Sequence, residues 1–123
     1  MALTKLRQPH VLAIFILLVA ALFIAGHQPW SGHLFPPPWD KVAHLLFYGA
    51  LTLLLAKAFP NTRLYLLGLA VFGIGCADEI HQRFVQDRHP GLDDLMFDLI
   101  GIAAAVLVFK AARHMQRARS QAQ

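Results

Sequence analysis

The chain has 123 residues, of which 57% are hydrophobic and only 15% are charged, and its net charge is +4. A soluble domain of this size usually carries about 25% charged residues. Here the charges are gathered in blocks between long apolar runs, which indicates an integral membrane protein in a lipid bilayer. The basic residues cluster at segment ends, where they orient membrane helices, so we expect no nucleic-acid partner. The single cysteine excludes an intrachain disulfide.

The first apolar run, residues 11–25, follows a short basic head at residues 1–10. A cleaved signal peptide has the same layout, but cleavage requires small residues at the last and third-last places before the cut. Phe23 and Ile24 stand at the third-last place for cuts after Ala25 and Gly26. We therefore predict an uncleaved first transmembrane helix that extends slightly into both interfaces.

A proline-rich loop is predicted at residues 27–39, because Pro36, Pro37 and Pro38 are incompatible with a helix interior. Further helices are predicted at residues 41–59, 64–81 and 92–110. Asp40, after the prolines, fits the N-cap of the second helix.

Small residues four apart predict close helix contacts at Gly73 with Ala77 and at Gly101 with Ala105. The expected fold is all-α, a polytopic membrane protein with a bundle of four transmembrane helices.

Four helices place both termini on one side of the membrane. Eight of the eleven Lys and Arg residues fall on that side, and three, Lys41, Arg83 and Arg88, fall on the other. The positive-inside rule then predicts that both termini are cytoplasmic. The expected organisation is a basic cytoplasmic head (1–10), a membrane domain (11–110) and a basic cytoplasmic tail (111–123). All seven acidic residues then lie at the outer side.

Two polar patches flank the apolar runs. The first opens the second helix and contains Asp40, Lys41, His44 and Tyr48. The second, residues 78–101, holds six of the seven carboxylates. Topology brings both patches to one depth, and helical spacing gives each helix a polar face. Because lipid penalises such faces, we expect them to meet in one site.

These residues resemble the VanZ-like family of small bacterial membrane proteins over about residues 40–105. The matching blocks are Asp40-Lys41-x-x-His44 with Tyr48, then Glu79 and Gln82 followed by Arg88, then Asp94 with Asp98 and Gly101. Asp98 departs from the pattern, because the family usually has Asn there.

The resemblance implies a four-helix protein of the bacterial cytoplasmic membrane with a role in the cell envelope. The founding member is associated with resistance to the glycopeptide teicoplanin. A distant kinship to membrane enzymes that act on lipid head groups has been proposed for the family, so a lipid-linked or phospholipid substrate is expected if the protein is catalytic.

The expected catalytic residues are His44, Asp40, Glu79 and Asp94. His44, steadied by Asp40, would act as base or nucleophile, and Glu79 and Asp94 would orient it or bind a cation. The expected substrate-binding residues are Arg88, Gln82, Lys41, Tyr48 and Asp98. Arg88 suits a phosphate, because its guanidinium binds two oxygens at once.

Structural alternatives stay open for the same residues. Asp40 fits a simple cap, Lys41 an interfacial lysine and Tyr48 a packing aromatic. Glu79 and Arg88 are expected to form an ion pair, which would be structural or functional. Asp93 fits the first turn of the last helix and is left outside the site.

Carboxylates with histidine could hold a divalent cation, but no tight ligand motif appears, so the metal is left unassigned. The alternative to an enzyme is a non-catalytic membrane protein that binds lipid or glycopeptide, or modulates an envelope partner.

Overall fold

The computed structural model describes residues 8–123, which form four α-helices and a 3-10 helix. Their bounds are α1 Pro9–Gly26, η1 Pro29–His33, α2 Trp39–Ala58, α3 Leu64–Gln82 and α4 Leu92–Gln121. No β-strand occurs within residues 8–123. Each α-helix is long and apolar enough to cross a membrane. The predicted all-α, four-helix fold is confirmed, and the chain is a multi-pass membrane protein.

Helix α2 starts earlier than the sequence suggested. Its N-cap is Pro38, Asp40 lies in the first turn, and no side chain makes a cap hydrogen bond. The predicted N-cap role of Asp40 is therefore wrong. The carboxylate remains near the positive end of the helix dipole, where a negative charge is favoured.

Helix α4 continues well past the predicted end at residue 110 and reaches Gln121. Its 30 residues correspond to about 45 Å, whereas a bilayer core is about 30 Å thick. The last turns consist mainly of Ala, Arg and Gln, which favour helix and include no Gly or Pro. The basic segment 111–121 thus extends α4 beyond its apolar part.

Helices α2 and α4 approach closely through glycines. A Cβ added at Gly101 would collide with the backbone of Leu45, and one at Gly49 would lie 3.2 Å from the Gly101 carbonyl oxygen. Gly101 and Ala105 are buried, as predicted. The predicted contact at Gly73 is wrong, because nothing lies within 4 Å of a Cβ added there.

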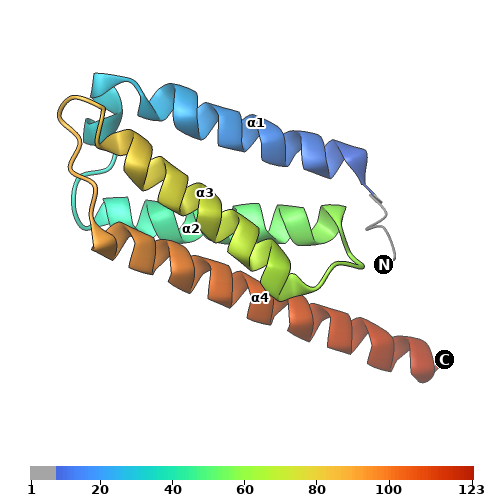
Figure 1. The fold of residues 1–123 in the computed structure, drawn as a ribbon. Coiled ribbons are helices and arrows are strands. Elements are labelled where there is room, and N and C mark those ends of the chain that lie inside the picture. The colour runs from blue at the N-terminus through green and yellow to red at the C-terminus, as the bar shows by residue number, and fades with distance from the viewer. Residues whose placement is uncertain (1–7) are drawn as a thin grey trace.

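The four helices run side by side with alternating direction (Figure 1). An apolar core fills the middle of the bundle, with Leu51, Leu55, Val71 and Ile102 buried in it. The start of α1 and the end of α4 lie at one end (Figure 1). The other end, where α2 and α4 begin and α3 ends, carries the two polar patches, and we call it the polar end.

Candidate functional site

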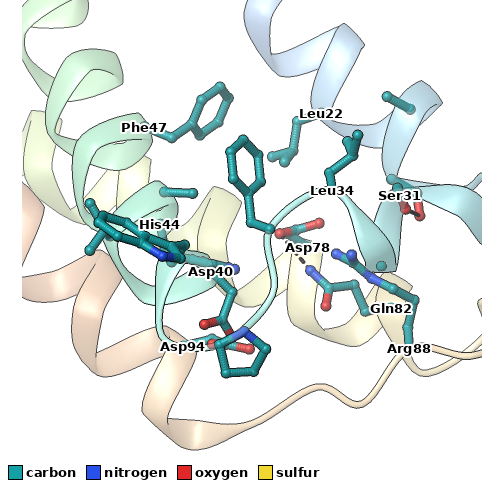
Figure 2. A pocket seen from close by; sticks show the side chains of 18 of the residues that line it. Leu22, Ser31, Leu34, Asp40, His44, Phe47, Asp78, Gln82, Arg88 and Asp94 are labelled. Atoms are coloured by element: carbon teal, nitrogen blue, oxygen red, sulfur yellow. Dashed lines mark hydrogen bonds between the residues drawn. The ribbon is translucent and has the colours of Figure 1, made fainter.

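A cavity of about 910 Å³ opens at the polar end, between α1, η1, α2, α3 and the loop before α4. Part of its wall is apolar and includes Leu22, Leu34 and Phe47. Another part is polar, and it contains Asp40, His44, Asp78, Gln82, Arg88 and Asp94. Figure 2 shows these two groups of side chains facing the same space from different elements. The cavity is therefore amphipathic, with polar and apolar surfaces in contact with one volume.

His44 is held by α4 rather than by its own helix. Its Nδ1 lies 2.7 Å from Oδ1 of Asp98, a residue that is 0% exposed. The expectation that Asp40 steadies His44 is wrong, because the hydrogen bond goes to Asp98. Because a carboxylate accepts hydrogen bonds, this contact favours a proton on Nδ1, which in the neutral imidazole places the lone pair on Nε2.

Asp78 joins α2 and α3 deep in the polar end. Its Oδ2 accepts hydrogen bonds from the Tyr48 hydroxyl at 3.3 Å and from Gln82 Nε2 at 2.9 Å. Its Oδ1 is buried and finds no partner among residues 8–123. Asp78 was missing from the predicted site. Its four-residue spacing from Gln82 was the available signal, since residues four apart in a helix are neighbours.

Glu79 contacts the loop before α4. Its Oε2 accepts a hydrogen bond from the backbone N–H of Gly91 at 3.1 Å. Its Oε1 is buried without a hydrogen-bond partner in the described chain. The predicted Glu79–Arg88 ion pair is wrong, because no such pair occurs within residues 8–123.

Arg88 lies in the loop between α3 and α4 and lines the cavity. The preceding residue, Asp87, has a φ of 61°, a left-handed conformation that Asp tolerates better than most residues. Gly32 of η1 packs on the Arg88 side chain, with an added Cβ only 3.2 Å from Cδ. Arg88 Nε is buried and has no hydrogen-bond partner among the described residues.

Lys41 contacts three carboxylates at the N-terminal ends of α2 and α4. Its Nζ lies 2.6 Å from Asp93 Oδ2 and 3.4 Å from Asp40 Oδ2, and it also contacts Asp94 Oδ1. Asp93, which the sequence left outside the site, is therefore part of this network. These contacts hold the N-terminal ends of α2 and α4 together.

Side chains from three helices converge in this arrangement. One potential ligand atom from each of His44, Glu79 and Asp94 lies within 4.8 Å of the others. The patches from α2, α3 and α4 thus meet at one end of the bundle, as their spacing suggested. The functional roles predicted for these residues remain proposals.

Comparison with known protein families identifies a match. The family model described as VanZ/LLP1 matches residues 7–113, most of the chain. No curated protein and no solved structure matches this chain.

Proposed function

We propose that this chain, which belongs to the VanZ/LLP1 family, binds the phosphate-bearing head group of a membrane lipid in its cavity and acts on it chemically. The amphipathic cavity supports this proposal. Leu22, Leu34 and Phe47 offer apolar contacts to a lipid chain, while Arg88 and His44 offer polar contacts to a head group. Ligand pockets commonly combine an apolar lining with a few polar groups that fix orientation.

The observation that carries the proposal is the state of Arg88. Its Nε is buried and has no hydrogen-bond partner within residues 8–123, and its guanidinium forms no ion pair with those residues. A buried polar donor without a partner is uncommon and is costly, by about 1–3 kcal/mol. A phosphate would satisfy the guanidinium with two parallel hydrogen bonds.

His44 is the group we propose for the chemistry. Asp98 fixes one ring nitrogen, so the other, Nε2, is available to a ligand as a base, a nucleophile or a metal ligand. Tyr48 stacks on the His44 ring, with the two ring centroids 6.0 Å apart. The His44 ring is therefore already oriented to react with a ligand bound in the cavity.

We propose that the polar end faces outward from the bacterial cytoplasmic membrane and that both termini are cytoplasmic. The distribution of Lys and Arg supports this orientation, because eight of eleven lie at the opposite end or in the terminal segments. A role in the cell envelope, including tolerance of glycopeptides, forms part of the same proposal.

The proposal is tested by lipid binding to the full chain. Purified protein is equilibrated with mixed phosphatidylglycerol and phosphatidylcholine, and retained lipid is measured by native mass spectrometry. We expect preferential retention of the anionic lipid, and loss of that preference in Arg88→Gln. Arg83→Gln is the matched control, since Arg83 is exposed and does not line the cavity. Equal retention by all three proteins would contradict the proposal.

A non-catalytic role is the second candidate, and a specific observation favours it. The polar contacts join helix to helix, as in Lys41 with Asp94 and Tyr48 with Asp78. Interhelical hydrogen bonds of this kind stabilise membrane bundles. Turnover of a lipid phosphate by wild-type protein, lost in a folded His44→Gln variant, would favour catalysis over this reading.

A further inference from the structure

The charged side chains that line the cavity are mostly negative, which disfavours the binding of a phosphate. The charged side chains that line it are Asp40, Asp78, Asp87, Asp94 and Arg88, so carboxylates outnumber the guanidinium. Glu79 and Asp98 do not line the cavity and are buried within the bundle. Like charges in a poorly solvated site repel strongly, and a phosphate would add to the excess. A further positive charge at the site would strengthen its binding of an anion.

We propose that His44, Glu79 and Asp94 bind a divalent metal ion at the polar end. One imidazole and two carboxylates form a ligand set that suits Zn²⁺ or Mn²⁺. The three residues come from α2, α3 and α4, and their ligand atoms lie within 4.8 Å of one another. Tetrahedral ligands about 2.0–2.2 Å from one ion lie about 3.3–3.6 Å from one another. The three ligand atoms, within 4.8 Å of one another, would therefore have to approach by about 1 Å, which side-chain rotation can supply.

Unused hydrogen-bonding capacity supports the assignment. Glu79 is 6% exposed, and its Oε1 is buried without a partner in residues 8–123. A buried carboxylate oxygen in this state is unfavourable unless a cation or a donor reaches it. Lys41 does not meet the need, because its ion pairs are with Asp40, Asp93 and Asp94.

The His44–Asp98 pair supplies a second, independent indication. A metal-binding histidine almost always donates its other ring N–H to a carboxylate or carbonyl, which fixes the tautomer and the ring. His44 does this through Nδ1 to Asp98 Oδ1 at 2.7 Å, which leaves Nε2 for the ion. Asp98 is therefore a positioning residue. A carboxylate makes the imidazole a stronger ligand than a neutral amide would.

The proposed ion would sit at the edge of the cavity. His44 and Asp94 line the cavity, whereas Glu79 is not part of its lining. Three protein ligands on one side leave coordination positions open toward the cavity, as in catalytic rather than structural metal sites. An oxygen of a phosphate held by Arg88 could then occupy an open position.

This inference deepens the proposed function, because the ion explains how an acidic cavity binds an anion. Metal binding is measured without lipid, so the two ideas can fail separately. An ion bound as proposed with no preference for anionic lipid would reject only the lipid proposal. Preference for anionic lipid without metal binding would reject only the metal site.

The test is titration of tag-free, chelator-treated full-length protein in detergent with Zn²⁺, followed by isothermal calorimetry. Mn²⁺ is titrated in parallel and followed by electron paramagnetic resonance. We expect one ion per chain in wild-type protein, and no measurable binding in Glu79→Gln or Asp94→Asn. Asp87→Asn is the matched control, since Asp87 is an exposed carboxylate in the loop before α4, forms no ion pair within residues 8–123 and lies outside the ligand set. It should bind like wild type.

A His27→Ala variant guards against a surface site, because His27 and His81 approach within 3.2 Å and could bind Zn²⁺ by themselves. Asp98→Asn keeps a hydrogen-bond acceptor for His44 and should weaken binding by about 10- to 100-fold. This variant decides the matter if a ligand variant fails to fold. No binding by wild type, unchanged affinity in Asp98→Asn, or binding lost only in His27→Ala would overturn the proposal.

Discussion

Nδ1 of His44 on α2 lies 2.7 Å from Oδ1 of Asp98 on α4, and Asp98 is completely buried. The second oxygen of Asp98 has no hydrogen-bond partner within residues 8–123 and lies against Gly75 of α3. The Asp98 carboxylate, on α4, therefore contacts both α2 and α3. It orients the histidine that faces the cavity, and its space exists because α3 has a glycine there.

This relationship predicts energetic coupling between the two residues. His44→Ala would leave the buried Asp98 carboxylate without its partner, which should lower the free energy of unfolding by about 1–3 kcal/mol. In a double-mutant cycle with Asp98→Ala, the coupling should be about 0.5–3 kcal/mol. Denaturant unfolding in detergent measures it. Additive effects would show that the hydrogen bond contributes little to the bundle.

Gly75 should tolerate no side chain. A Cβ added there would lie 2.8 Å from Asp98 Oδ2 and 3.4 Å from Tyr48, so Gly75→Ala should destabilise the protein by about 1–3 kcal/mol. Gly73→Ala is the matched control on the same helix, with nothing within 4 Å. Removing a helical glycine there should be neutral or stabilising by up to about 1 kcal/mol. Thermal unfolding of both variants checks this, and equal melting temperatures would refute it.

Lys41 should matter more than another lysine of α2. Lys41→Gln would remove the cation that contacts Asp94, which is 7% exposed, and should cost about 1–3 kcal/mol. Lys57→Gln changes an exposed lysine at the opposite end of α2 and should have little effect. Folded yield and unfolding in detergent provide the comparison. A Lys57 effect as large as that of Lys41 would contradict the role of the Lys41 network.

The proposed orientation of the chain in the membrane rests on the asymmetry of basic residues. A reporter active only outside the cytoplasm should be silent when fused after Gln123 and active when inserted near Gly32. The reverse pattern would move the polar end, and the site with it, to the cytoplasmic face.

Apolar runs and proline breaks predicted the four helices to within a few residues, apart from the end of α4. They also predicted that the polar patches meet, because topology and helix ends alone bring His44, Glu79 and Asp94 to one depth. The polar side chains were expected to face inward because exposing them to lipid is energetically unfavourable.

The pairing of side chains was not predictable in the same way. His44 bonds Asp98 rather than Asp40, and Glu79 bonds Gly91 rather than Arg88. Partner choice depends on helix rotation, which the close approach of Gly49 and Gly101 helps to set. Helices that are apolar nearly all round carry little information about their rotation.

The proposed function requires that the cavity at the polar end holds a lipid head group. The most direct test is an experimental structure of the full chain in a lipid phase that contains phosphatidylglycerol. We predict phosphate density within hydrogen-bond distance of the Arg88 guanidinium, beside His44, with acyl-chain density along Leu22 and Phe47. A cavity filled only by acyl chains, or a head group bound only at the opposite end near Arg63 and Arg113, would contradict the claim.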